Sequence, residues 1–375
     1  MNKQSALTII WGGQFGSEGK GQIAAYIQKT EPHDIAVRVG GPNAGHTFYV
    51  DKSNGPKKFP AIKVVVQSIP VATYLGAMGM IGAAGYVIPD LLRDELIQGY
   101  RITGQPLSLI IDPLAAVINV AHMSQEGPIK FRIGSTGEGV GAATAEKVMR
   151  EPGITVRAHL PAFERWVRYP WGSRISILNT VPIINGGLRV GDKIMLEGTQ
   201  GYGLSLHTGG YYPFCTSREC TPQALIAETG TNIHHLRHSL DSIMVLRTYP
   251  IRVGGNSGPL PNEITWDTLS DRTGGYVSTP EITTVTKKVR RIAEFDDELV
   301  ERAIDQCGPT AIALNFVDYV WPEISKCNHP GEFPEKVNLW LLATQDRLGV
   351  PIKYVSWGPG KTSEWGGATT KWGGQ

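Results

Sequence analysis

The sequence predicts an α/β protein with a mainly parallel central sheet and helices on its faces. Short apolar runs rich in Ile, Val and Leu recur along the chain, and several are apolar throughout, as is typical of parallel strands covered on both faces. Segments with helical periodicity lie between some of these runs. Alternating strand and helix patterns are typical of parallel sheets joined by helical crossovers.

The predicted strands share this continuous apolar character. In chain order they are Leu7–Ile10, Ile35–Val39, Lys63–Val66, Leu107–Ile111, Lys193–Leu196, Ser242–Thr248, Ala311–Phe316 and Ile352–Ser356. The predicted helices are Ile23–Lys29, Asp90–Gln98, Pro222–His238 and Asp297–Cys307. No repeat or long linker divides the chain, so we expect one domain with inserted subregions over residues 1–362 and a glycine-rich surface tail over residues 363–375.

The composition limits the kinds of partner and the cellular compartment that we expect. The 375 residues include 36 Lys and Arg against 34 Asp and Glu, a net charge of +2. This balance gives no global preference for nucleic acid or membrane, so we expect neither as a partner, and any anion site must be local. Four cysteines without a Cys-x-x-Cys motif, and an N-terminus without a signal-peptide pattern, predict reduced thiols in a cytoplasm.

One segment, Val64–Pro89, contains no charged residue and is long enough for a membrane span. Glycines recur at every third position from Gly76 to Gly85, and Pro70 interrupts the run. We therefore favour buried strands and close-packed turns over a span.

The segment WGGQFGSEGKGQ, Trp11–Gln22, follows a predicted strand and precedes a predicted helix. It fails the Walker pattern, because Gln14 stands where the first glycine is needed and Gly21 follows Lys20. The dinucleotide fingerprint matches only weakly, so a Rossmann oxidoreductase is a runner-up. The glycines still let backbone N–H groups approach an anion at a helix N-terminus, which predicts a phosphate site.

Several motifs further along the chain resemble those of the adenylosuccinate synthetase family, in the family's order. The segment VRVGGPNAGHTFYV (Val37–Val50) resembles its Asn-Ala-Gly-His-Thr loop, and QFGSEGKGQ stands where the family has Gln-Trp-Gly-Asp-Glu-Gly-Lys-Gly-Lys. The other similar segments are Ile133–Gly141, Leu196–Gly201, Tyr212–Ser217, Thr283–Asp296, Asn315–Asp318 and Ser356–Thr362. The resemblance implies a fold related to the P-loop nucleotide-binding proteins.

The resemblance also implies a reaction. A nucleoside triphosphate phosphorylates O6 of a purine nucleotide, and the amino group of L-aspartate then displaces the phosphate. This chemistry depends on positioning and charge neutralisation. The implied catalytic residues are Ser17, Lys20, His46 and Gln200, with His46 as the acid at O6 because its pKa lies near working pH. Magnesium is implied at Ser17 and at the carbonyl of Gly45.

The implied binding residues fall into three groups. For the nucleoside monophosphate they are Ser17, Asn43, Ala44, Thr136, Arg150, Gln200, Thr216 and Val253. For aspartate they are Thr284, Thr286, Lys288 and Arg290. For the triphosphate they are Gly19, Lys20, Gly21, Gln22, Gly45, Thr47, Asn315, Phe316, Asp318, Ser356, Gly358 and Pro359. The family places Arg150 in the site of the neighbouring subunit, so the resemblance implies a homodimer.

The chain departs from the family pattern at two positions. Ser17 replaces the aspartate that takes the proton from N1, and a shorter side chain with an acceptor oxygen suits a purine that carries a 2-amino group. This matches a viral branch of the family that converts dGMP to the succino precursor of 2-aminoadenine, in the host cytoplasm. Phe316 replaces a lysine of the GTP site, so we expect ATP or dATP rather than GTP.

Other interpretations stay open at the level of sequence. The chain could be an ordinary IMP-using and GTP-dependent enzyme of the family, or a nucleotide-binding protein without catalysis. His234 and His238 share a predicted helix face, which we interpret as solvated rather than as a zinc site because no third ligand is evident.

Overall fold

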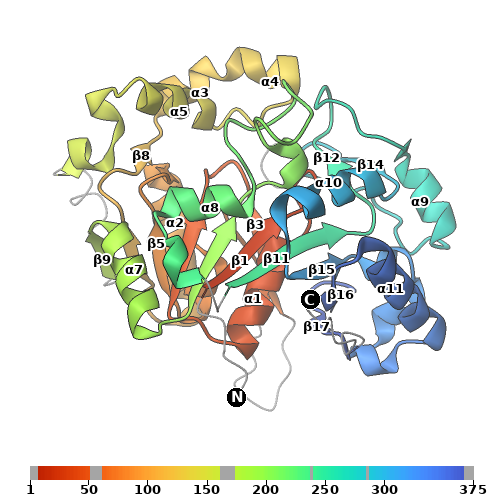
Figure 1. Ribbon diagram of the computed structural model, residues 1–375. Helices are drawn as coiled ribbons and strands as arrows, with labels where there is room; N and C mark the ends of the chain where they lie inside the picture. The colour runs from red at the N-terminus through yellow and green to blue at the C-terminus, as the bar shows by residue number, and fades with distance from the viewer. Residues whose placement is uncertain (1–6, 51–60, 161–173, 237–239, 284–286, 367–375) are drawn as a thin grey trace.

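The structure, a computed structural model, describes residues 7–50, 61–160, 174–236, 240–283 and 287–366 (Figure 1). Its centre is a ten-stranded sheet in the order β17-β16-β15-β11-β1-β10-β2-β5-β7-β9. Neighbouring strands run parallel except at the edge pair β16 and β17, which is antiparallel. The predicted α/β fold with a mainly parallel sheet is confirmed.

The strands of this sheet are short and mostly buried. In sheet order they are β17 Thr362–Glu364, β16 Ile352–Ser356, β15 Ala311–Asn315, β11 Leu240–Arg247, β1 Leu7–Gly12, β10 Ile194–Gly198, β2 Ile35–Val39, β5 Met78–Ile81, β7 Ser108–Ile111 and β9 Arg174–Ile177. Three further small sheets pair β3 (His46–Val50) with β4 (Ile62–Val66), β6 (Tyr86–Val87) with β8 (Ala116–Val117), and β12 (Ile251–Arg252) with β14 (Arg291–Ala293) and β13 (Glu263–Ile264).

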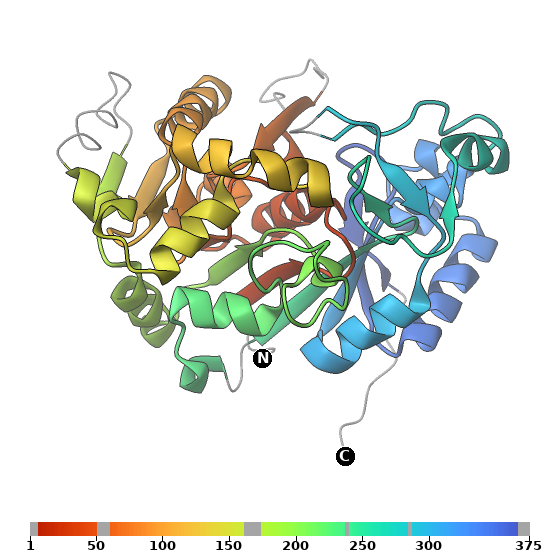
Figure 2. The same ribbon diagram turned by 90° about the horizontal axis from the view of Figure 1, so that it is seen from above.

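Helices cover both faces of the central sheet (Figures 1 and 2). Alternate residues of β1 point to opposite faces, so Ile9 belongs to one apolar cluster and Ile10 to another. The first cluster includes residues of α7 (Thr180–Val190), α8 (Pro222–Thr229), α10 (Asp297–Cys307) and α11 (Glu335–Leu348). The second includes residues of α1 (Lys20–Thr30) and α2 (Pro89–Thr103).

The remaining described helices lie away from these two layers. Figure 1 shows three of them grouped at the top of the view and the fourth at the right, beside the small sheet of β12 and β14. They are α3 (Val120–Gln125), α4 (Gly127–Ile133), α5 (Val140–Val148) and α9 (Trp266–Arg272).

Each predicted strand segment overlaps an observed strand, but one of these strands lies outside the central sheet. Residues Lys63–Val66 lie in β4, which pairs with β3 outside the central sheet. The charge-free segment Val64–Pro89 holds part of β4 and then β5 and β6, as strands and turns. None of the helices in the described part of the chain is long and apolar enough to cross a membrane.

The predicted helix Pro222–His238 is wrong beyond Thr229. Gly230 ends α8 in the left-handed conformation, with φ 63°, and a separate 3₁₀ turn (Ile233–Leu236) carries His234. His238 lies outside the described residues. The predicted helix that would carry both histidines on one face therefore ends before His234.

The sheet also continues into the predicted tail. Ser363 and Glu364 pair with β16, and the Trp365 side chain is buried and donates to Asn338 Oδ1 at 3.0 Å. This part of the predicted surface tail is therefore integrated into the fold.

The parallel arrangement places the loops that carry the sequence motifs at one edge of the sheet. The loops after β1, β2, β10, β15 and β16 all leave the carboxyl ends of parallel strands. Ligand sites of open α/β sheets lie at this edge.

Candidate active site

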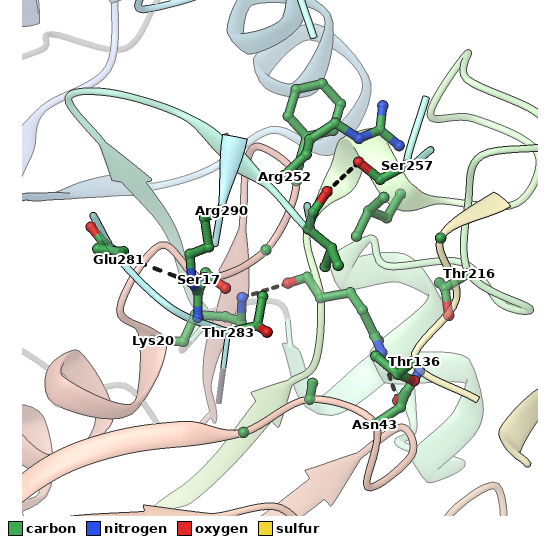
Figure 3. A pocket seen from close by; sticks show the side chains of 18 of the residues that line it. Ser17, Lys20, Asn43, Thr136, Thr216, Arg252, Ser257, Glu281, Thr283 and Arg290 are labelled. Atoms are coloured by element: carbon green, nitrogen blue, oxygen red, sulfur yellow. Dashed lines mark hydrogen bonds and ion pairs between the residues drawn. The ribbon is translucent and has the colours of Figure 1, made fainter. Parts of the chain in front are cut away.

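A cleft of about 860 Å³ opens at the carboxyl edge of the sheet. It gathers most of the residues selected from the sequence. These are Ser17, Gly19, Lys20, Gly21, Gln22, Asn43, Ala44, Gly45, His46, Thr47, Thr136, Gln200, Thr216, Val253, Arg290, Asn315, Phe316, Asp318, Ser356, Gly358 and Pro359. Figure 3 shows Ser17, Lys20 and Arg290 on one side of the cleft and Asn43, Thr136 and Thr216 on the other.

Four selected residues are not in this lining. Arg150 lies just past the end of α5, exposed and with φ 65°, and the backbone N–H of Lys288 donates to the Thr283 hydroxyl at 2.9 Å. Thr284 and Thr286 lie outside the described residues.

A buried carboxylate shapes the loop after β1. The Glu18 side chain is fully buried, and Oε1 accepts from the backbone N–H of Gly16 at 2.7 Å and of Gln14 at 3.2 Å. Its Oε2 accepts from Lys20 Nζ at 2.6 Å, and Lys20 Nζ also donates to the carbonyl of Gln200 at 2.5 Å. Glu18 is not among the site residues predicted from the sequence, although an acid two residues before the lysine of a glycine loop is a visible signal.

Two glycines of this loop have no room for a side chain. A Cβ at Gly19, where φ is 93°, would lie 2.5 Å from Asn315 Nδ2, and a Cβ at Gly21 would lie 2.7 Å from the carbonyl of Thr47. The loop after β1 therefore packs directly on the end of β15, and the first turn of α1 packs on β3.

Gln200 links the loop after β10 to the loop after β2. Its backbone is in the left-handed region, with φ 53°, an unusual conformation for a residue other than glycine. Its Nε2 donates to Asn43 Oδ1 at 2.7 Å, and its Oε1 accepts from the Thr199 hydroxyl at 2.6 Å. Both ends of the amide are held, so its position in the cleft is fixed before any ligand binds.

A buried arginine sets the state of His46. Arg38 Nη1 lies 2.5 Å from His46 Nδ1, and Arg38 Nη2 donates to the carbonyl of Ala44 at 2.7 Å. A guanidinium only donates, so Nδ1 must accept and the ring proton must be on Nε2. That Nε2 is buried and has no hydrogen-bond partner among the described residues.

The same surroundings keep His46 neutral. Burial, followed by the positive charges of Arg38 and Lys20, holds the pKa of His46 well below its usual value. The expectation of a pKa near working pH is therefore wrong for the ligand-free site. His46, which lines the cleft, is therefore a neutral ring with its proton on the buried Nε2 rather than an imidazolium.

Burial lowers the pKa of Arg38 to about 10, and the charges of the buried Glu197 and Glu95 carboxylates oppose this shift. The Glu197 carboxylate lies 3.6 Å from His46 Nδ1, and burial raises its pKa while its hydrogen bonds from the N–H groups of Val71 and Ala72 lower it. Arg38 is not predicted as a site residue from the sequence, because its role depends on contacts across three separate segments.

Ser17 occupies the tip of the loop after β1. It is exposed and has φ 60°, and its carbonyl accepts from Arg247 Nη1 at 3.3 Å. Arg247 Nη2 also donates to Glu281 Oε1 at 2.5 Å, and Arg290 Nε lies 3.9 Å from Glu281 Oε2. Burial would raise the pKa of Glu281, but the charge of Arg247 and its hydrogen bonds outweigh this and hold the pKa below its usual value.

Aromatic and acidic groups form the wall after β15. Phe316 has φ 62°, and the guanidinium carbon of Arg247 lies 3.9 Å from the centre of its ring. Asp318 Oδ2 accepts from the Tyr276 hydroxyl at 2.8 Å, and burial raises the pKa of Asp318 to about 6. Beside this wall, Gln22 Nε2 of α1 donates to Ser356 Oγ at the end of β16 at 2.5 Å.

The arrangement combines phosphate-binding backbone, fixed polar groups and a stacking surface in one cleft. No cluster of three or more His, Cys, Asp or Glu side chains suited to a metal ion occurs in the described part of the chain.

Comparison with known proteins identifies the family. The model of the adenylosuccinate synthetase family matches residues 9–169 and 162–321. An N6-succino-2-amino-2'-deoxyadenylate synthase of Vibrio phage phiVC8 is 34% identical over 351 residues, which cover 92% of this chain and 94% of the phage protein. An adenylosuccinate synthetase of Methanococcus aeolicus is 33% identical over 358 residues, covering 94% and 96% of the two chains.

A solved structure agrees with this assignment. The succinoaminodeoxyadenylate synthetase of cyanophage S-2L, bound to dGMP and to dATP as an energy donor, has a TM-score of 0.75 and 28% identity, covering 96% of this chain and 95% of that one. The family match, the shared fold and the motif residues that meet in the cleft agree on one family. The chain belongs to the adenylosuccinate synthetase family and is a carbon–nitrogen ligase that joins aspartate to a purine nucleotide at the expense of a nucleoside triphosphate.

Proposed function

We propose that the chain condenses L-aspartate with C6 of dGMP, driven by ATP or dATP. The products are N6-succino-2-amino-2'-deoxyadenylate, the nucleoside diphosphate and phosphate. The phage relative carries the name of this activity, and the cyanophage structure holds dGMP and dATP.

The observation that carries the choice of dGMP is the serine at the tip of the loop after β1. Ser17 lines the cleft and is exposed to it, so its side chain can meet a bound base. The family has a longer, charged aspartate here, which would crowd a 2-amino group. The serine hydroxyl leaves room for that group and can accept one of its hydrogens.

The fixed groups around the cleft suit the first chemical step. Phosphorylation places negative charge on O6 and on the transferred phosphoryl group. A neutral His46 Nε2–H and the amide of Gln200 are donors that stabilise this charge without reorganising. The N–H groups at the start of α1, with Lys20, suit the triphosphate itself.

Arg290 is the basic side chain that we assign to a carboxylate of aspartate. It lies 3.9 Å from Glu281 Oε2, a long contact that leaves its planar donor group available to a second carboxylate. Lys288, Thr284 and Thr286 complete the assigned clamp on the basis of the family motif.

The residues of the cleft also fit a magnesium ion that is bound by protein and substrate oxygens together. Of the nearby acids, Glu18 is held by Lys20 and by two backbone N–H groups, and Glu281 is held by Arg247. The carbonyl of Gly45 and the hydroxyl of Ser17 would then be the protein ligands, and phosphate oxygens would supply the rest, as magnesium prefers. Bound there, the ion would neutralise phosphate charge.

Arg150 completes the proposed site in trans. It lies outside the cleft lining of its own chain and is exposed at the end of α5. We assign it to the 5'-phosphate in the partner subunit of a homodimer, as the family motif implies.

The test is phosphate release from the purified protein with aspartate and ATP, comparing dGMP, GMP and IMP. We expect release with dGMP above that with IMP, and a product whose mass equals dGMP plus aspartate minus water. Release that is highest with IMP would assign the ordinary family reaction instead. Nucleotide binding without release in any mixture would refute the ligase assignment.

A further inference from the structure

The wall after β15 contains the Asp318 carboxylate, whose two oxygens have different hydrogen-bond surroundings. Asp318 lies in a 3₁₀ turn (Val317–Tyr319) that follows β15, and it lines the cleft although only 3% of it is exposed. Its Oδ2 accepts from the Tyr276 hydroxyl at 2.8 Å. Its Oδ1 is buried and has no hydrogen-bond partner within the part of the chain that the structure describes.

An unpartnered buried acceptor in the lining of a cleft indicates a ligand donor, because such groups are nearly always satisfied. The Phe316 ring lines the cleft beside Asp318, and Arg247 covers one of its faces at 3.9 Å. An aromatic ring next to a free acceptor suits a planar base that carries an amino group. Asn315, at the end of β15, donates to the carbonyl of Glu18 at 2.6 Å, so this wall adjoins the glycine loop that suits phosphates.

We propose that Tyr276 makes this wall selective for adenine over guanine by holding Oδ2 of Asp318. Guanine presents two adjacent donors, the N1–H and the 2-amino group, and pairs best with both oxygens of a carboxylate. Adenine presents one donor, its 6-amino group, beside an acceptor nitrogen. With Oδ2 engaged by the hydroxyl, Asp318 offers one free oxygen, which matches the single donor of adenine.

The Tyr276 hydroxyl acts as a hydrogen-bond donor at neutral pH. Burial, followed by the charge of Asp318, raises the pKa of Tyr276 to about 12, so the phenol keeps its proton at neutral pH. Tyr276 is not in the cleft lining, and 41% of its surface is exposed. It therefore acts on the ligand through Asp318, as a positioning residue. The inference rests on the proposed function only in taking this wall as the site of the triphosphate base.

The test uses the full chain with magnesium at pH 8, where Asp318 is ionised. Calorimetry gives the Kd of ATP, GTP and purine riboside 5'-triphosphate, which lacks the amino group. Phosphate release with dGMP and aspartate gives kcat/KM for ATP and GTP. The variant is Tyr276→Phe, which removes only the hydroxyl. The matched control is Tyr26→Phe, whose hydroxyl accepts from the Glu364 N–H at 3.1 Å, outside the cleft lining.

We expect the wild type to bind ATP more tightly than GTP, and purine riboside triphosphate about 10-fold more weakly than ATP. In Tyr276→Phe the preference for ATP over GTP should fall about 10-fold or more, because Oδ2 becomes available to guanine. Tyr26→Phe should leave the preference unchanged.

An unchanged preference in a folded Tyr276→Phe protein would overturn the inference, and so would tighter binding of GTP by the wild type. The comparison of ATP with GTP in the wild type needs no variant, so the test holds even if Tyr276→Phe does not fold. Nucleotide binding with the expected preferences but no phosphate release would refute the ligase assignment and leave the role of Tyr276 intact.

Discussion

Replacing Ser17 by aspartate is the sharpest test of substrate choice. Ser17 has φ 60°, a conformation that aspartate adopts more readily than most residues, so the backbone does not oppose Ser17→Asp. The new carboxylate would be next in the chain to Glu18, which is fully buried. It would also crowd C2 of a bound purine and restore the base that the family uses at N1.

The size of the expected change in substrate preference follows from the contacts that a bound guanine would lose. A guanine 2-amino group would lose one hydrogen bond to the serine oxygen and would meet a longer side chain. Together these cost about 2–4 kcal/mol, or about 30- to 1000-fold in preference. We expect Ser17→Asp to lose turnover with dGMP and to gain some with dIMP.

The assay is kcat/KM for dGMP and dIMP at saturating aspartate and ATP, for wild type, Ser17→Asp and Ser17→Ala. The alanine variant keeps the space and removes only the acceptor, so it should lose about 10-fold with dGMP and gain nothing with dIMP. Equal preferences in the wild type and Ser17→Asp would show that Ser17 does not select the substrate.

Three other outcomes follow from the geometry of the cleft. His46→Ala should lower turnover by about 10²- to 10⁴-fold while dGMP binding by calorimetry survives, and near-normal turnover would remove His46 from the mechanism. At pH 6 the ¹⁵N shifts of the His46 ring should report a neutral ring with its proton on Nε2, because burial and Arg38 hold its pKa well below 6.5; a cationic ring would contradict the assigned contact. Mixing Arg150→Leu with His46→Ala protein should restore part of the activity, since each hybrid dimer would hold one site with both residues intact. No recovery after confirmed subunit exchange would exclude a role for Arg150 in trans.

The fold and the position of the site follow from local patterns to a large extent. Continuous apolar runs such as Ala311–Phe316 predict buried parallel strands, and the motifs at their ends must then meet at one edge of the sheet. Strand β5 is not predicted as a separate strand, because its sequence, MGMI, lies among the regularly spaced glycines of the charge-free segment, for which the sequence predicts only buried strands and turns in general. Helix α8 ends early at Gly230 although apolar residues continue beyond it.

The contacts that set the chemistry could not be predicted in this way. Arg38 and Arg247 lie in or at the end of strands, where their sequence context indicates only buried strand positions. Arg247 reaches Ser17 because β11 pairs with β1, a neighbour relation between segments 230 residues apart that no local pattern contains. Only the order of the strands in the sheet shows which loops contact the same side chain.

That order places Arg247 at the junction of all three proposed subsites. Its guanidinium donates to the Ser17 carbonyl beside the proposed dGMP base, pairs with Glu281 beside the aspartate clamp, and covers Phe316 in the wall assigned to the triphosphate base. Residues that share one buried partner do not contribute independently to binding. Changes at Ser17, Glu281 and Phe316 should therefore be coupled through Arg247, and the cleft is better understood as one charge-centred unit than as three separate pockets.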